Sequence, residues 1–179
     1  MNQRINSFIT LHKPELRFLV MFFVLFLLIQ TIHYATRSWT EPFLVTMLHV
    51  QASSKIINIL TPQEASYVQY KVIRSDSAGI LVDDGCDGVE AFILILAAIC
   101  AFPAGPWRKT VGIVGGLGVV YFFNLARIVC LYYISKYHED AFDVMHIYVG
   151  QTIMVIIGLI IFIFWAIKFA GNEQNHSKK

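Results

Sequence analysis

The chain has 179 residues, of which 56% are hydrophobic and 15% charged, and its net charge at pH 7 is only +2. Soluble domains contain about 45–50% apolar and about 25% charged residues, so this composition excludes an ordinary soluble enzyme. The small net charge gives no sign of a nucleic-acid partner, and three scattered cysteines are too few for a disulfide framework. The composition therefore predicts an integral membrane protein.

Four apolar stretches approach the ~20 residues that a bilayer-spanning helix needs. In chain order they cover residues 16–34, 88–105, 110–134 and 147–169. The first is longer than the core of a cleaved signal peptide and no small-residue cleavage site follows it, so we expect an uncleaved anchor. The sequence predicts an all-α integral membrane protein with four transmembrane helices, built as a single membrane domain over residues 1–179.

Basic residues are unevenly shared between the segments that flank these stretches. One set of flanking segments holds eight basic and two acidic residues, namely Arg4, Lys13, Arg17, Arg108, Lys109, Lys168, Lys178 and Lys179 with Glu15 and Glu173. In the other set, five basic residues stand against eight acidic ones. Because Lys and Arg favour the cytoplasmic side, we expect both termini in the cytoplasm and an even number of spans.

The segment 36–85 lies on the outer side in this topology. Within it, residues 42–60 are apolar, but polar residues are scattered around the helical circumference, which favours an interfacial helix over a fifth span. Within residues 67–82, apolar and polar side chains alternate over 68–72, a turn-forming stretch follows over 75–79, and the apolar residues 80–82 resume as a second strand. This pattern predicts a small β-hairpin. The polar tail, residues 171–179, is expected to be disordered.

Three reactive side chains stand near the outer ends of the last three predicted spans. A charge within a span usually faces a cavity or a partner, because exposing it to lipid is costly. In the four-span topology, Cys86, Arg127 and His146 come to one depth of one leaflet. Glu90 lies one turn after Cys86 if that helix begins near residue 85, and Asn124 lies one turn before Arg127.

The chemistry that suits this trio is the attack of a thiolate on an acyl group. The pKa of a thiol falls beside a cation or at a helix N-terminus, and Cys86 is expected to have both. His146 can take the thiol proton and return it to the leaving amine. Arg127 can stabilise the oxyanion of the tetrahedral intermediate, where one such donor contributes ~2.7–4 kcal/mol.

Four further polar residues are expected to support the trio: Asp87, Glu90, Asn124 and Asp143. We expect Glu90 to pair with Arg127, and Asp143 to orient His146. Taken singly, each member of the trio also has an ordinary explanation, since a cysteine in a membrane protein is usually inert and an arginine near a span end often reaches the headgroups. The coincidence of three groups at one depth favours the catalytic interpretation.

The ordered set Gly85-Cys86-Asp87-Gly88, Asn124-Leu125-Ala126-Arg127 and His146 resembles the exosortase/archaeosortase family, and the short chain is most similar to the exosortase H type. The resemblance covers residues 80–169. It implies a membrane-embedded cysteine transpeptidase or protease of the bacterial inner membrane, with Cys86, Arg127 and His146 catalytic on the periplasmic face. Asp87 departs from the family pattern, where a small polar residue is expected.

The resemblance also implies the partners of the protein. Its substrates are exported proteins with a C-terminal motif, a hydrophobic span and a basic cluster, and we expect neither a cofactor nor a metal ion. Two alternatives stay open. One is a non-catalytic membrane scaffold in which Arg127 and Glu90 form a structural ion pair. The other is a redox or metal-handling protein that uses Cys86 with His146, although the chain has no C-x-x-C motif.

Overall fold

The computed structural model describes residues 13–82 and 86–170. Three of its helical stretches are long and apolar enough to cross a membrane, namely Lys13–Leu60, Pro106–Tyr137 and Glu139–Lys168. They contain the first, third and fourth predicted spans almost entirely, and they identify a membrane protein. The tail predicted to be disordered, residues 171–179, lies outside the described residues.

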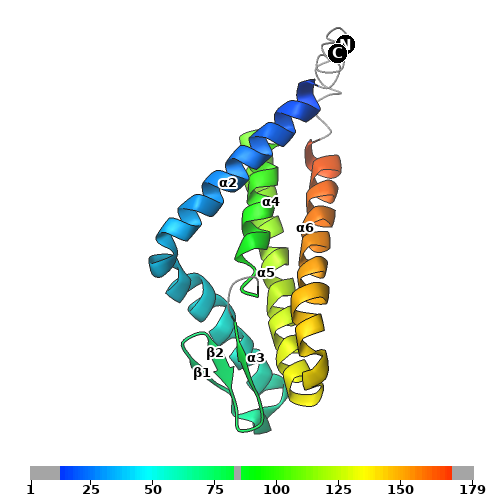
Figure 1. Ribbon diagram of the computed structural model, residues 1–179. Helices are drawn as coiled ribbons and strands as arrows, with labels where there is room; N and C mark the ends of the chain where they lie inside the picture. The colour runs from blue at the N-terminus through cyan, green and yellow to red at the C-terminus, as the bar shows by residue number, and fades with distance from the viewer. Residues whose placement is uncertain (1–12, 83–85, 171–179) are drawn as a thin grey trace, which may run out of the picture.

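The first stretch is one helical run that changes direction near its middle. It comprises α2 (Lys13–Glu41), the π-helix η1 (Pro42–Val50) and α3 (Gln51–Leu60). Pro42 has no backbone N–H to bond the preceding turn, which interrupts the regular α-helical hydrogen bonding at this point. In Figure 1, α2 leans away from the other helices and α3 turns back toward α5. The predicted anchor is therefore the N-terminal part of a longer helix.

Residues 42–60, predicted as a separate interfacial helix, continue α2 directly. α3 packs against α5 and buries one face that carries Ser53, Ser54 and Ile57. Of the scattered polar residues that argued against a span here, His49, Ser53 and Ser54 are thus buried inside the protein, whereas Gln51 and Lys55 are exposed. The position of this helix relative to the lipid headgroups stays a prediction.

A three-stranded antiparallel sheet follows the short 3-10 turn η2 (Pro62–Glu64). Its strands are β1 (Tyr67–Gln69), β2 (Val72–Arg74) and β3 (Gly79–Leu81), with Ile73 of β2 opposite both Val68 and Ile80. The prediction of a two-stranded hairpin was wrong in strand number. The chain turns at Tyr70, whose φ is +59°, inside the stretch whose alternation suggested one continuous strand.

The predicted second span forms only a short helix, α4 (Val89–Ala101), of 13 residues. At 1.5 Å per residue α4 is ~20 Å long, whereas the hydrocarbon core of a bilayer is ~30 Å thick. Four transmembrane helices are therefore not established, and the described residues give three long apolar helices and a shorter one. α4 begins beside Asn124, well inside the length of the next helix.

The two remaining long stretches run beside each other (Figure 1). α5 (Pro106–Tyr137) has 32 residues and begins at a proline, which needs no hydrogen bond for its nitrogen in the first helical turn. The last stretch consists of four elements: η3 (Glu139–Ala141), the π-helix η4 (Val144–Gly150), α6 (Gln151–Trp165) and η5 (Ala166–Ala170).

Two apolar clusters divide the bundle along its length. The first joins α3, the sheet, the loop before α4 and the later part of α5, through Val45, Val50, Ile57, Ile73, Ile80, Val82, Cys86, Val89, Ile93, Ile128, Val129, Leu131 and Tyr132. The second joins α4, α5 and α6 through Ile95, Ile99, Val120, Met154 and Trp165. We call these regions the sheet half and the basic half, because Lys13, Arg17 and Lys109 stand at the far end of the second.

A buried carboxylate ties the sheet half together. Glu64 is paired with Lys136, and it accepts hydrogen bonds from Tyr132 and from Ser77, 2.7 Å away. These interactions, with Lys136 the largest contributor, lower the pKa of Glu64 from 4.5 to about 2 against the opposing effect of burial. The network connects the turn before the sheet to the last turns of α5.

Candidate functional site

The loop that carries Cys86 enters α4 through a glycine that no other residue can replace without strain. Gly88 has φ +77°, and a Cβ atom added there would come within 2.6 Å of the Asn124 side chain. Cys86 itself is only 2% exposed and packs in the apolar cluster of the sheet half. Gly85, the first residue of the motif, lies outside the described residues.

Asn124 of α5 fixes this loop from the side. Its Nδ2 donates a hydrogen bond of 2.9 Å to the backbone oxygen of Asp87, and the Asn124 side chain is fully buried. The Asp87 carboxylate in turn accepts a bond of 3.0 Å from the backbone N–H of Val89, one of the groups that a helix N-terminus leaves unsatisfied. Two side chains that the sequence assigned to supporting roles thus hold the backbone on the C-terminal side of Cys86.

Arg127, one turn further along α5, contacts the beginning of the last helical stretch. Its Nη2 donates a hydrogen bond of 3.1 Å to the backbone oxygen of His146. The guanidinium lies so close to Gly150 that a Cβ atom there would be 2.6 Å from Nε. The arginine therefore fixes the position of η4 relative to α5, and the absence of a side chain at residue 150 makes room for it.

His146 lies on η4 with its ring stacked on Phe142, at a centroid distance of 5.5 Å and an interplanar angle of 17°. Its side chain is half-buried, whereas Asp143, expected to orient it, is exposed. No hydrogen bond joins the side chains of Asp143 and His146 among the interactions of the described residues. The contact between Arg127 and His146 runs through the backbone oxygen rather than the imidazole.

The environment of Cys86 differs from the expectation in one important respect. Burial raises the pKa of the thiol from 9.0 to about 11, with smaller contributions from the nearby charges of Asp87 and Glu90, while Arg127 lowers it. The prediction of a lowered pKa was wrong because burial of the thiol outweighs the effect of Arg127. The helix also begins at Val89 rather than near residue 85. Cys86 thus precedes the helix, and it does not share a helical face with Glu90.

Glu90 and Arg127 border the same small cavity. It has a volume of about 80 Å³ and lies between α4, α5 and α6, with Gln151 as a third polar lining residue. Gln151 was not among the predicted site residues. The available signal was its strongly polar amide near the start of the apolar stretch 147–169.

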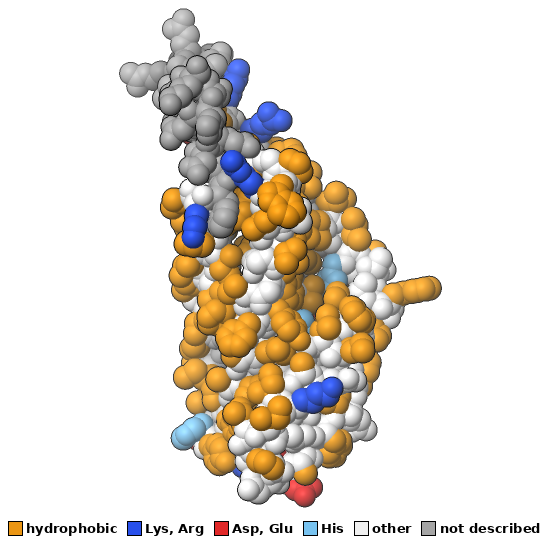
Figure 2. All heavy atoms as spheres, turned by 180° about the vertical axis from the view of Figure 1, so that it is seen from behind, with side chains coloured by type: hydrophobic (Ala, Val, Ile, Leu, Met, Phe, Trp, Pro, Cys, Tyr) orange, Lys and Arg blue, Asp and Glu red, His pale blue; other side chains and the backbone are white. Residues whose placement is uncertain are grey.

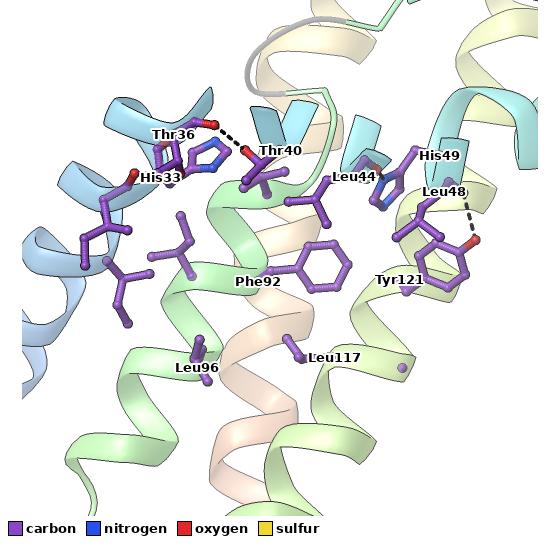
Figure 3. A pocket seen from close by; sticks show the side chains of 15 residues that line it. His33, Thr36, Thr40, Leu44, Leu48, His49, Phe92, Leu96, Leu117 and Tyr121 are labelled. Atoms are coloured by element: carbon purple, nitrogen blue, oxygen red, sulfur yellow. Dashed lines mark hydrogen bonds between the residues drawn. The ribbon is translucent and has the colours of Figure 1, made fainter. Parts of the chain in front are cut away.

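A much larger apolar cavity of about 590 Å³ lies on the other side of α4, between α2, η1, α4 and α5 (Figure 3). Leu44, Leu48, Phe92, Leu96 and Leu117 are among its lining residues. We call it the apolar cavity. Its size is within the ~300–1,000 Å³ of typical small-molecule and cofactor pockets.

His49 is the most deeply buried polar residue of this lining, at 1% exposure. Its Nδ1 lies 2.6 Å from the backbone oxygen of Leu44, and its ring packs between Phe92 and Tyr121 (Figure 3). The sequence treated His49 only as one of several polar residues in 42–60. Its burial depends on the turn of the chain at η1, which the residue pattern did not reveal.

The first turn of α4 separates the two cavities. Val89 and Phe92 face the apolar cavity, whereas Glu90 and Ala91 face the small polar one. Cys86 lies three residues before this turn. Cys86 itself lines neither of these two cavities.

The structure thus brings the predicted residues together to different degrees. Arg127 influences the Cys86 thiol electrostatically and bonds the His146 backbone, so the guanidinium links the three segments. Asn124, Asp87 and Glu90 adjoin it. Asp143 is exposed, but it lies close enough to His146 to act on the ring electrostatically. Across residues 13–82 and 86–170, no three His, Cys, Asp or Glu side chains form a group that could hold a metal ion.

Comparison with known proteins gives one match. A sequence model of the transmembrane exosortases matches residues 10–164, which include the Cys86 loop, Arg127 and His146. No similar curated protein and no similar solved structure was found.

Proposed function

Because the chain belongs to the transmembrane exosortase family, we propose that it is a membrane-embedded cysteine transpeptidase or peptidase. The family acts on exported proteins that carry C-terminal signals. In this proposal the protein cleaves such a signal at the outer face of the bacterial inner membrane, through a thioester on Cys86. The signal combines a short motif, a hydrophobic span and a basic cluster.

One observation carries the assignment of the site. The charge of Arg127 opposes the burial that raises the pKa of the Cys86 thiol, and Arg127 donates a hydrogen bond to the backbone of His146. A single guanidinium thus connects residues that are 60 positions apart. A charge of this kind within a membrane protein normally marks a functional site. It is also suited to stabilise the negative charge that develops on a carbonyl oxygen during acyl transfer.

The proposed reaction has two stages. The Cys86 sulfur attacks the scissile carbonyl carbon while His146 accepts the thiol proton, and Arg127 stabilises the oxyanion. The C–N bond then breaks, His146 returns the proton to the leaving amine, and a thioester remains. Water or an amine attacks the thioester, releases the acyl group and restores the thiol.

The raised pKa of Cys86 favours one version of the first stage. A thiol with a pKa of about 11 is almost entirely protonated at neutral pH. Proton removal must then accompany the attack instead of preceding it, so His146 acts as a general base and not as the partner of a resting thiolate. In this proposal, substrate binding brings His146, which is stacked on Phe142 in the free protein, within reach of the thiol proton.

We propose further that the apolar cavity accommodates apolar residues of the substrate next to the scissile bond. The position of the apolar cavity supports this proposal, since Val89, three residues after Cys86, borders the cavity. The cavity is too small for a whole transmembrane helix, which fills ~2,000 Å³ or more at ~10 Å diameter and ~30 Å length. A few side chains of an unwound segment match its volume.

The deciding experiment replaces Cys86 by alanine and follows the maturation of an exported substrate in cells. We expect processing to stop in Cys86→Ala while the protein still accumulates in the membrane, because the alanine fills most of the thiol's space. Cys100→Ala is the matched control, since Cys100 is a free thiol at the other end of α4. Normal maturation in Cys86→Ala would refute the proposed activity.

The same experiment separates the enzyme from a scaffold. The shared cavity of Glu90 and Arg127 is compatible with a purely structural role for both residues. In that case Arg127→Ala would reduce the abundance of the protein, while Cys86→Ala would leave every phenotype unchanged. If the protein is an enzyme, Cys86→Ala stops substrate maturation at unchanged protein abundance.

A further inference from the structure

A second polar cavity lies at the end of the bundle opposite the sheet. It has a volume of about 720 Å³ and is formed by the first turns of α2, the end of α4 and the connection to α5. Lys13, Arg17 and Lys109 line it together with Phe18, Met21 and Phe102. Figure 2 shows Lys and Arg side chains gathered at this end of the molecule. We call it the basic cavity.

The charges of the basic cavity are all positive. Its lining contains three basic residues and no Asp or Glu. Among residues 13–82 and 86–170, none of the three takes part in an ion pair. Three cations around one hollow repel each other, so the arrangement favours an anion between them.

One of the cations is held in place by the fold. The Lys109 Nζ donates a hydrogen bond of 2.6 Å to the backbone oxygen of Cys100, which belongs to the last turn of α4. An ammonium group has three N–H donors, so two remain for a ligand. Lys109 is therefore an anchored donor and differs from a freely moving surface lysine.

The floor of the cavity is apolar. Phe18 packs edge-to-face on Phe102 at 5.9 Å and stacks on Phe162 at 5.8 Å, which links α2, the end of α4 and α6. Met21 continues the apolar surface along α2 and is 42% exposed. A ligand with only an anionic group would leave this surface uncovered, whereas a ligand with an attached hydrocarbon chain would cover it.

We propose that the basic cavity binds an anionic phospholipid, with its phosphate among Lys13, Arg17 and Lys109 and the start of an acyl chain on Phe18, Met21 and Phe102. Basic pockets between transmembrane helices are suited to such headgroups. The lipid would bridge α2 to the α4–α5 connection. This inference does not rest on the proposed enzymatic activity.

The test measures lipid binding to the purified full-length protein in nanodiscs. One set contains phosphatidylcholine alone and the other contains phosphatidylcholine with phosphatidylglycerol. We expect phosphatidylglycerol to be retained by the wild-type protein on transfer to detergent, as seen by native mass spectrometry, and to raise its thermal unfolding temperature. Each basic residue removed should weaken retention about fivefold, and high salt should weaken it as well.

The decisive variants are Arg17→Gln and Lys109→Gln, singly and together. Lys168→Gln is the matched control, because Lys168 is a basic residue at the same end that does not line the cavity. Arg17→Lys preserves the charge and should retain the lipid, so it separates loss of binding from loss of folding. Equal retention in the double variant and in Lys168→Gln would overturn the proposal.

A third arm distinguishes a lipid from a free anion. Inorganic phosphate is added to protein in phosphatidylcholine nanodiscs at the same concentration of phosphate groups. The proposal requires little or no stabilisation, because phosphate cannot cover the apolar floor. Stabilisation equal to that by phosphatidylglycerol would show that the cavity takes the free anion, and an equal effect of both lipid mixtures would show that it selects no anionic headgroup.

Discussion

The two halves of the bundle are held together by different physical means. In the sheet half, polar side chains join segments that are far apart in the sequence, as Asn124 does with the Cys86 loop and Glu64 with Lys136. In the basic half, α4, α5 and α6 meet through small and apolar residues. Gly116, for example, lies under Ile95, and a Cβ atom there would come within 2.8 Å of that side chain.

This difference shows that the close packing of helices and the exact placement of a loop have different physical causes. Small residues let helices approach within a membrane, where there is no hydrophobic force between them, but they fix the position of no particular loop. A hydrogen bond between buried groups does fix it, since breaking that bond leaves a polar group unsatisfied. The residues proposed for catalysis lie where polar bonds specify the geometry.

The largest effect is expected from breaking the bond that holds the Cys86 loop. Asn124→Ala removes the donor to the Asp87 backbone, and a displacement of ~1 Å at a nucleophile can reduce the rate about 100-fold. We expect kcat for substrate cleavage to fall by that order in purified protein. Stability should fall by ~1–3 kcal/mol.

The matched control for this variant is Asn58→Ala. Asn58 also clamps a loop, with its side chain bonded to both the N–H and the C=O of Ser66 at 2.6 and 2.8 Å, but that loop is remote from Cys86 in the chain. Asn58→Ala should lose stability and keep its activity per folded molecule. If both variants lost activity in proportion to folded protein, Asn124 would have no special positioning role.

A smaller effect is expected from filling the apolar cavity at the border of the two halves. Gly118 of α5 lines this cavity, and a Cβ atom there meets nothing within 4 Å. Gly118→Leu should raise KM about 10-fold at nearly constant kcat, because it removes binding space without touching the reacting groups.

Gly115→Leu provides the comparison for the filled cavity. Gly115 also has open space around it, but it lines a different groove, between α5 and α6. Both substitutions change helix propensity equally. An unchanged KM in Gly118→Leu, or the same rise in both variants, would remove the apolar cavity from the proposed substrate path.

The smallest effect concerns stability alone, in the sheet half. The pKa of Glu64 is lowered from 4.5 to about 2, so its ion pair stabilises the fold fully above pH 4.5 and loses this contribution as the pH falls toward 2. Glu64→Gln should therefore unfold at a lower temperature than the wild type at pH 7. The difference should shrink between pH 4.5 and pH 2.

Glu139→Gln serves as the reference for this pH series, because Glu139 is an exposed acid at the same end of the bundle. Its unfolding temperature should follow that of the wild type at every pH. A constant gap between Glu64→Gln and the wild type down to pH 2 would mean that the charge of Glu64 does not contribute to stability.

The features that were predicted well are those determined by the length and hydropathy of long segments. Three of the four apolar stretches are long helices because their length and hydropathy leave no alternative in a bilayer. The exosortase resemblance, based on the Cys86 loop, Arg127 and His146, is confirmed by the family match. The catalytic roles of these residues stay predictions.

The features that were missed depend on single residues and on tertiary contacts. The turn at Tyr70 contains no Gly or Asn, the residues that usually indicate a turn of this kind. Its neighbour Lys71 forms an ion pair with Glu41, at the end of α2. The start of α4 is set by Gly88, which has a positive φ and also leaves room for the Asn124 side chain. Neither contact is visible in local periodicity.

The shortness of α4 has a consequence for how readily water reaches the proposed thioester on Cys86. Cys86 enters the bundle beside Asn124, which is 13 residues, or ~20 Å along the helix axis, from the sheet end of α5. In the proposed reaction, a thioester on Cys86 would be screened from water by the side chains packed around it, since Cys86 is only 2% exposed. By placing Cys86 inside the bundle, the short helix would thus slow hydrolysis of the proposed intermediate.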